Sequence, residues 1–262
     1  MRKHLVYCLS ASCLMFSVAS NAQVSDGDGL YAGVQLDRSW QNIDGHSNQL
    51  FFNGSIGAFS NLGATSFSND QNLLSGKVFV GQNYFNDDFV LGAELGASWY
   101  QNTKETIHIR NATVDLTVSE YVTKISPNYM LSFSLLPGVQ VDSVTFYGRI
   151  GAGMSHYNIF ENSVIDTEVS PEVYSIGKNA DIWSPEVILG LGIKKKFSNN
   201  LAVRLEYNYT KSKSFSVPFN VARSTAVTSV VRALDNNYSF SSNSLGLGLI
   251  YECDGPETVF TK

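Results

Sequence analysis

The sequence has little charge, few cysteines and no excess of basic residues. Only 16% of its 262 residues are charged, whereas typical soluble domains carry about 25%. The formal net charge is -5, from 18 lysines and arginines against 23 aspartates and glutamates. This composition argues against a disordered chain and against a nucleic-acid-binding protein, because no basic surface would attract a polyanion. A mildly acidic surface suits a secreted or cell-surface protein.

The first 22 residues have the pattern of a signal peptide. Arg2 and Lys3 precede an apolar stretch over residues 5–18, and residues 20–22 are small enough for signal peptidase to cut after Ala22. Serines interrupt the apolar stretch, and it is shorter than the roughly 20 apolar residues of a spanning helix. We therefore expect cleavage after Ala22 rather than a membrane anchor.

The mature chain lacks the features of a disulfide-bonded protein and of a helical membrane protein. Cys8 and Cys13 lie in the predicted signal peptide, which leaves Cys253 as a single thiol and excludes an intramolecular disulfide framework. No run of 18 or more uncharged apolar residues follows residue 22. If the mature protein crosses a membrane, it therefore does not cross it with helices.

Alternation of apolar residues with small or polar residues predicts β-strands. Phe89, Leu91 and Leu95 alternate with Gly92 and Glu94, which is the period-two pattern of a strand. The pattern occurs eight times, over residues 30–36, 76–81, 89–100, 129–135, 144–155, 186–194, 201–210 and 245–251.

The connections between these strands alternate between short and long. Three short links are rich in turn-forming residues and predict hairpins, at residues 85–88, 140–143 and 198–200. Four long links cover residues 41–71, 101–126, 158–183 and 211–243. If the strands run up and down, all four long links fall at one end, which is the layout of an outer-membrane barrel.

Composition indicates which face of each strand points outward, since a soluble lipid-carrier barrel would show the same alternation with its apolar face inside. The non-apolar face is rich in glycine, which would weaken a solvated strand but makes room for larger side chains in a narrow lumen. Aromatic residues lie near strand ends on the apolar face, as in the girdles of membrane barrels. We predict an all-β protein: an eight-stranded antiparallel up-and-down transmembrane β-barrel over residues 23–253, with four long extracellular loops, short periplasmic turns and a short C-terminal tail over residues 254–262.

Three stretches, at residues 29–36, 76–96 and 144–153, resemble the small outer-membrane proteins related to the OmpA transmembrane domain and the opacity-type surface proteins. The resemblance implies a location in the Gram-negative outer membrane among its lipid and lipopolysaccharide, insertion by the barrel-assembly machinery, and loops that face outward. Family members commonly end in phenylalanine after the last strand, whereas here Cys253 takes that place and nine residues follow it.

The inward face of the predicted barrel carries charges of both signs, which should pair because unpaired charges in a poorly hydrated interior are costly. Counting from the short turns puts Arg204 and Lys194 close to the periplasmic rim. The same count puts four charged residues at similar mid-barrel height: Lys77, Glu94, Arg149 and Glu206. The resemblance also implies an ionic network that blocks the lumen, and we expect Glu94 and Arg149 to belong to one plug. The predicted network comprises Lys77, Glu94, Arg149, Glu206, Arg204, Lys194 and Glu186.

Two functions remain open from the sequence. A surface protein would present its loops for adhesion, host interaction or envelope integrity, whereas a narrow or gated porin-like channel would conduct through its lumen. The first long connection favours the surface protein, because it carries more apolar side chains than a solvated loop needs. These candidate residues for binding an extracellular ligand could also pack on the barrel mouth; they are Phe51, Phe52, Ile56 and Phe59.

The sequence does not predict an enzyme, a cofactor or a metal site. His46, His108 and His156 fall in or beside the long links without the spacing of metal ligands. Ser155 and His156 weakly resemble the residues of outer-membrane hydrolases, but adjacent strand residues point to opposite faces. They could therefore share a catalytic site only if the strand ended there.

Overall fold

A computed structural model describes residues 28–53, 58–101, 105–112, 117–167, 170–224 and 229–253, with side chains described over 29–46, 66, 68–101, 123–160, 179–217 and 236–253. The predicted signal peptide (1–22) and tail (254–262) lie outside the described residues. Within the described part of the chain, no helix has the length and apolarity needed to cross a membrane. The strands are β1 (Asp28–Asn53), β2 (Ala58–Asn86), β3 (Phe89–Tyr100), β4 (Glu105–Ala112), β5 (Thr117–Val141), β6 (Val144–Thr167), β7 (Ser170–Lys196), β8 (Leu201–Ser212), β9 (Phe215–Ser224) and β10 (Ser229–Glu252).

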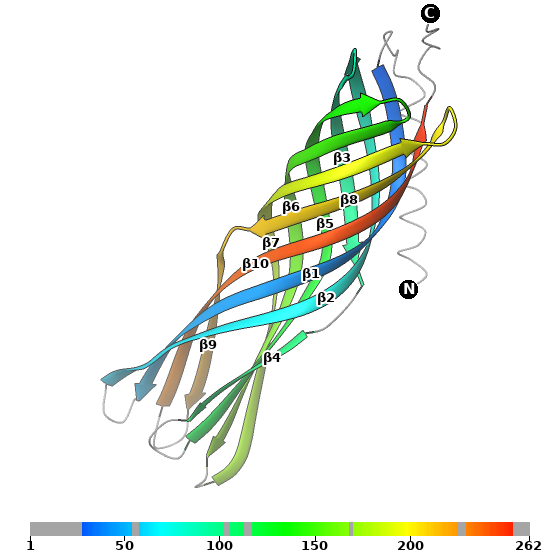
Figure 1. Ribbon diagram of the computed structural model, residues 1–262. Coiled ribbons are helices and arrows are strands. Elements are labelled where there is room, and N and C mark those ends of the chain that lie inside the picture. The colour runs from blue at the N-terminus through cyan, green and yellow to red at the C-terminus, as the bar shows by residue number, and fades with distance from the viewer. Residues whose placement is uncertain are drawn as a thin grey trace, which may run out of the picture.

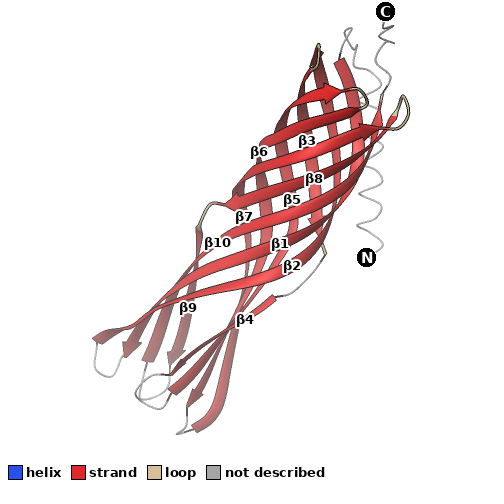
Figure 2. Ribbon diagram, viewed as in Figure 1, coloured by secondary structure: helices blue, strands red, loops and turns tan. Residues whose placement is uncertain are grey.

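The strands form one closed antiparallel ring, which confirms the predicted barrel (Figures 1 and 2). The ring runs β1-β2-β3-β5-β6-β7-β8-β10, and β10 pairs with β1 to close it. β4 pairs with β5 as a continuation of β3, and β9 pairs with β10 as a continuation of β8. The barrel wall is therefore eight-stranded. Closure leaves no unpaired sheet edge in the membrane.

Tight turns close the periplasmic end, as predicted from the three short links. β2 and β3 are joined by a two-residue turn at Asp87 and Asp88, and β5 and β6 by one at Asp142 and Ser143. Asp87 and Asp142 have φ angles of 53° and 54°. Aspartate tolerates this left-handed conformation, which two-residue hairpin turns require.

The four long connections lie at the opposite end, and most of each is β-hairpin rather than irregular loop (Figure 1). β1 and β2 stay paired from Trp40 opposite Asn72 to Asn53 opposite Ala58. The period-two apolar signal fades there because the outward face meets water, where Asp44 is exposed, while the inward face mixes the polar Gln41 with the apolar Ile43, both buried. The hydrogen-bond ladder continues without an apolar outward face, so hydropathy gives no clear period-two signal for these strands.

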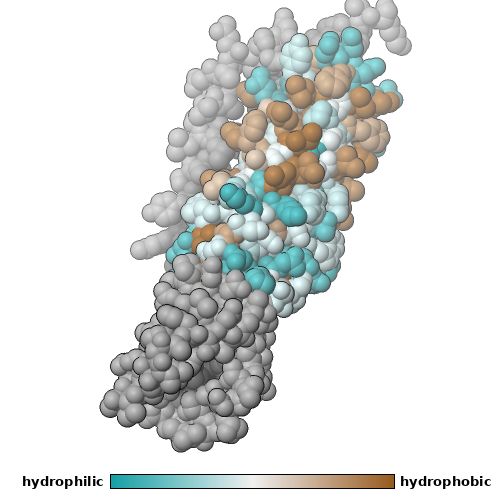
Figure 3. Space-filling view, turned by 90° about the vertical axis from the view of Figure 1, so that its left-hand side faces the viewer, coloured by the Kyte–Doolittle hydropathy of each residue, from teal (hydrophilic) through white to brown (hydrophobic). Residues whose placement is uncertain are grey.

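The outward face of the barrel is apolar, as the sequence predicts. Leu95 is 59% exposed and Leu191 69% exposed, while the alternate residues face the lumen and are buried. Figure 3 shows apolar side chains gathered over the barrel, with a more polar zone on the side of the hairpins. Inward glycines make room for large side chains: a Cβ at Gly192 would overlap the ring of Tyr147.

An aromatic girdle marks the outer boundary of the apolar band. Trp99, Tyr129, His156 and Trp183 form one row across four strands. The rings of Tyr129 and His156 are stacked with centroids 4.7 Å apart, and Trp183 packs edge-on against both. Such girdles lie at the membrane–water interface. The parts of β1, β2, β5, β6, β7 and β10 beyond this row therefore project from the membrane.

Candidate functional site

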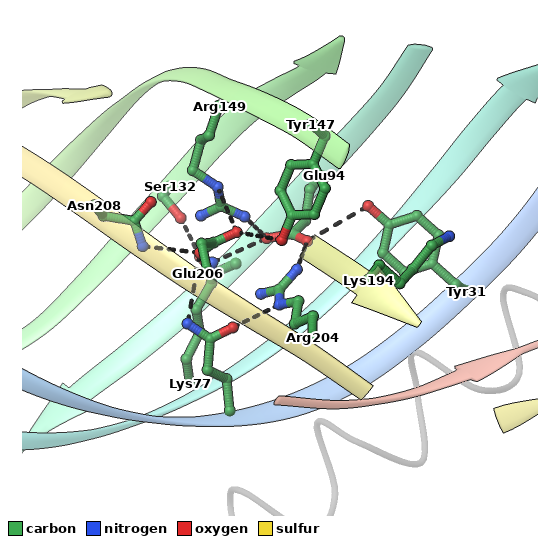
Figure 4. Close-up of polar contacts among 12 residues, drawn as sticks. Tyr31, Lys77, Glu94, Ser132, Tyr147, Arg149, Lys194, Arg204, Glu206 and Asn208 are labelled. Atoms are coloured by element: carbon green, nitrogen blue, oxygen red, sulfur yellow. Dashed lines mark hydrogen bonds and ion pairs between the residues drawn. The ribbon is translucent and has the colours of Figure 1, made fainter. Parts of the chain in front are cut away.

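The centre of the lumen is an ionic cluster built around Glu94 of β3 (Figure 4). Lys77 of β2 donates to Glu94 Oε1 from 2.9 Å, and Arg204 Nη1 of β8 donates to Glu94 Oε2 from 2.5 Å. Arg149 of β6 also contacts Glu94 Oε1 through its Nη2 atom. All four side chains are almost completely buried. One carboxylate thus joins three strands across the lumen.

Glu206 of β8 is the second anionic centre of the cluster. Arg149 Nε lies 3.3 Å from Glu206 Oε2, so Arg149 bridges the two glutamates. Tyr147 donates its hydroxyl to Oε2 from 2.9 Å, and Asn208 donates its amide to Oε1 from 2.8 Å. These donors come from β6 and from β8 itself, the two neighbours of β7 in the wall, so they fill this side of the lumen as well as neutralise Glu206.

The cluster also contains Gln35 and Asp37 of β1, which, like Tyr147 and Asn208, are absent from the sequence prediction. Gln35 accepts a 2.5 Å hydrogen bond from Arg204 Nε and donates one of 2.5 Å to Asp37 Oδ1. With Asp37, the cluster holds three carboxylates against the three cations of Lys77, Arg149 and Arg204. Extending the alternation of residues 30–36 by one residue would have found Asp37, which is buried on the inward face.

The other predicted network residues occupy different places in the lumen. Arg204 starts nearer the periplasmic rim than Glu206, but its guanidinium extends to Glu94. Lys194 stays at the rim, where its Nζ lies 2.8 Å from Glu252 Oε1 and that of Lys196 lies 2.7 Å from Oε2. Glu186 accepts a 2.7 Å hydrogen bond from the Tyr157 hydroxyl, toward the outer mouth. The structure therefore brings five of the seven residues together and separates Lys194 and Glu186 from them.

An apolar core fills the lumen beyond the aromatic girdle. Tyr157 and Phe240 stack with ring centroids 4.2 Å apart, and Phe215 packs against both. Its buried members come from five strands, β1, β5, β6, β9 and β10. A second apolar cluster lies within the barrel and contains Tyr31, Phe79 and Ile250. The apolar mouth core comprises Ile43, Ile125, Tyr157, Ile159, Val217, Tyr238 and Phe240.

The residues considered for catalysis or metal binding do not converge. Ser155 is buried on the inward face, whereas His156 faces outward into the aromatic girdle. Among the described residues no group of three histidines, cysteines, aspartates or glutamates could hold a metal ion. His46 contacts the Ser66 hydroxyl at 3.1 Å on the β1–β2 hairpin, and the side chain of His108 lies outside the described residues.

The predicted loop-binding residues lie at the far end of the β1–β2 hairpin. The backbone register sets Phe52 opposite Phe59 and Phe51 opposite Ser60. The side chains of these three phenylalanines lie outside the described residues, as does the whole of Ile56.

Comparison with known proteins gives the family of this chain. The model of the outer membrane protein beta-barrel domain matches residues 8–252. The attachment invasion locus protein Ail of Yersinia pestis is 11% identical, with a TM-score of 0.34, over 82% of this chain and 98% of Ail. Its complex with the heparin analogue sucrose octasulfate gives 14% identity and a TM-score of 0.33, over 83% of this chain and 99% of Ail.

Neisserial surface protein A is 13% identical, with a TM-score of 0.31, over 82% of this chain and 96% of that protein. No curated protein sequence matches. The expected resemblance to small outer-membrane barrels is confirmed by the family match, which spans nearly the whole chain. The chain therefore belongs to the outer membrane protein beta-barrel domain family, whose members reside in the Gram-negative outer membrane.

Proposed function

We propose that this protein is a non-conducting surface protein that presents four β-hairpins outside the outer membrane for adhesion, host interaction or envelope integrity. The observation that carries the proposal is the continuation of the barrel strands, still paired, far beyond the aromatic girdle. β1 has 26 residues and β2 has 29, whereas a strand crosses the bilayer with about 9–11. More than half of each strand is therefore available outside the membrane.

The apolar mouth core supports a presenting role because it makes the base of the hairpins rigid. Each of the four hairpins contributes at least one buried side chain to this core. Ala180 and Ile182 of β7 pack against its edge. Packing of this kind holds neighbouring hairpins in one arrangement before a partner binds. Binding then costs little conformational entropy. A flexible loop would lose more conformational entropy on binding.

The filled lumen supports a closed barrel over the alternative of a narrow or gated channel. The ionic cluster spans the middle of the lumen, and the apolar mouth core lies above it. Eight strands enclose a space that side chains can fill. A channel would need both layers to move, which would separate buried charges from their partners.

The proposed contact surface includes the tip of the β1–β2 hairpin, with Phe51, Phe52, Ile56 and Phe59. Support comes from the backbone register, which brings Phe52 and Phe59 together at the end farthest from the membrane. Contiguous apolar residues exposed on a surface protein commonly mark binding sites. Such a tip suits a partner with an apolar patch.

The route to the membrane is part of the same proposal. A signal peptide over residues 1–22 would direct export and be cleaved after Ala22. The barrel-assembly machinery would then insert the strands among outer-membrane lipid and lipopolysaccharide. Mass measurement of the mature chain purified from outer membranes tests the cleavage site directly.

The binding role is tested with refolded protein in fluorescent vesicles added to cultured epithelial cells. We expect replacement of Phe51, Phe52 and Phe59 by serine to reduce vesicle attachment, while serine at Val164 and Ile165 of the β6–β7 hairpin serves as a matched control. Heat-dependent gel mobility verifies that each variant folds. Attachment that persists after each hairpin is shortened in turn would overturn the adhesion proposal.

A further inference from the structure

Gly148 of β6 is a glycine that the barrel itself does not need. It lies on the outward face between the inward residues Tyr147 and Arg149. Apart from its two chain neighbours, the nearest atom to a Cβ added at Gly148 would be the Pro137 carbonyl oxygen, 3.9 Å away. By contrast, a Cβ at the inward Gly192 would overlap the ring of Tyr147. A glycine weakens a strand, and inside one it often marks a site where a ligand approaches closely.

The missing side chain opens a groove of about 630 Å³ in the outer wall of the barrel. Large outward residues form its walls, so the groove is apolar and open to the bilayer. It extends from β3 to β10, and its part at Phe146 lies beside the short turns, because Phe146 stands three residues after the Asp142–Ser143 turn. Its principal lining residues are Pro137, Phe146, Gly148, Leu191, Ile193 and Tyr207.

A single lysine stands at the periplasmic edge of this groove. Lys195 follows Ile193 on the outward face of β7, with Val144 and Val203 on the neighbouring strands. Its neighbours Lys194 and Lys196 both bind Glu252. Within the described part of the chain, Lys195 has no carboxylate partner; its ammonium lies 5.8 Å from the ring centroid of Phe197, which is exposed at the rim. Two of the three consecutive lysines therefore pair with Glu252, while Lys195 is directed toward the membrane surface.

We propose that this groove binds one anionic phospholipid of the periplasmic leaflet, with an acyl chain over Gly148 and the phosphate at Lys195. The two features lie in the order that a phospholipid requires, because the apolar groove faces the hydrocarbon and the cation faces the headgroups. A lysine near a membrane surface attracts anionic headgroups. The aliphatic and aromatic walls suit a thin, flexible acyl chain, which can enter the groove and make van der Waals contacts along it. A flat protein surface would leave the groove empty and lose those contacts.

The chemistry of the groove separates this ligand from other occupants. Lipopolysaccharide occupies the outer leaflet, on the side of the aromatic girdle and the hairpins, whereas the groove lies beside the periplasmic turns. A fatty acid would supply the chain without the phosphate, and inorganic phosphate would supply the anion without the chain. A second copy of this barrel would need to bury Lys195 in an apolar contact without a carboxylate.

Native mass spectrometry of the full mature protein, with phosphatidylglycerol titrated into neutral detergent, measures this binding. We expect Lys195→Gln to weaken retention about fivefold, which is the effect of one lysine near a membrane surface. Gly148→Leu should abolish preferential retention, because the leucine occupies the groove. Matched controls are Lys211→Gln, an exposed lysine at the other end of β8, and Ala152→Leu, which places the same leucine side chain elsewhere on the outward face of β6. Neither control should change retention.

Separate titrations with oleate, inorganic phosphate and lipopolysaccharide distinguish the sources. The proposal holds if phosphatidylglycerol is retained more strongly than each of them and both groove variants weaken it. It fails if Gly148→Leu behaves as Ala152→Leu does, if Lys195→Gln behaves as Lys211→Gln does, or if lipopolysaccharide is preferred. It also fails if dimers form that Gly148→Leu dissociates. Lys195→Gln changes only a surface residue, so the test does not depend on the folding of the glycine variant.

Discussion

Glu94→Gln should destabilise the barrel strongly, because Glu94 is the sole carboxylate that pairs with two of the three central cations among the described residues. Lys77 and Arg204 form ion pairs with Glu94 only, whereas Arg149 also reaches Glu206. Each lost hydrogen bond to a charged group contributes about 1.5–3 kcal/mol. Glutamine keeps one acceptor oxygen but removes the charge, so we expect a loss near the roughly 3–5 kcal/mol measured when one partner of a buried ion pair is removed.

The assay is equilibrium unfolding in urea with the protein refolded into lipid vesicles, followed by tryptophan fluorescence. Glu186→Gln is the matched control, since Glu186 is also buried in the lumen but accepts its hydrogen bond from Tyr157, which glutamine can also accept. We expect the control to change the free energy of unfolding by less than about 1 kcal/mol. Adding Lys77→Met to Glu94→Gln should recover part of the loss, because it removes one of the cations left without a partner.

Planar bilayer recordings test the same cluster as a barrier to ions. Wild-type protein should conduct little, while Glu94→Ala should raise ion leak because it removes the central carboxylate and opens space between Arg149 and Arg204. Equal stability of Glu94→Gln and Glu186→Gln would refute the electrostatic argument. A large wild-type conductance that Glu94→Ala leaves unchanged would show that the lumen is an open channel.

Three further predictions follow from the faces of the wall. Leu95→Arg should reduce stability by about 2–4 kcal/mol, since Leu95 faces lipid; the folded fraction in a heat-mobility gel measures this, with Leu95→Phe as a neutral control. Phe240→Ala should cost about 3–5 kcal/mol in the apolar mouth core and speed protease cleavage of the hairpins; unchanged cleavage would contradict the role of that core. Gly192→Ala should cost about 1–3 kcal/mol in urea unfolding because its Cβ meets Tyr147, while Gly148→Ala, which meets open space, should not.

The strands of the barrel wall and their two faces were predictable from the sequence alone. Period-two alternation is a local property of the strand, and lipid outside a filled lumen forces opposite chemistry on its two faces. The outward position of Leu95 and the inward position of Glu94 could therefore be predicted without knowing which strands pair. The short turns at Asp87 and Asp142 were equally readable, because a two-residue hairpin depends on local backbone preferences.

The strands outside the membrane could not be found in the same way. Around Gln41 and Asp44, the outward face meets water and the inward face mixes polar side chains with the buried Ile43, so the alternation gives no clear strand signal. Pairing with β2 and β10 keeps this segment extended. Tyr238 and Phe240 do alternate with polar residues, but only the closed ring brings them against Tyr157 of β6.

Which lumen charges meet depends on the closed barrel and could not be predicted from the sequence. The sequence put Lys77, Glu94, Arg149 and Glu206 on the inward face, but height counted from the turns did not foresee that Arg204 reaches Glu94. Strand tilt and stagger in a closed barrel set which inward residues stand opposite each other. Long side chains then extend along the lumen to the nearest opposite charge, so that Lys194 pairs with Glu252 at the rim rather than with the central glutamates.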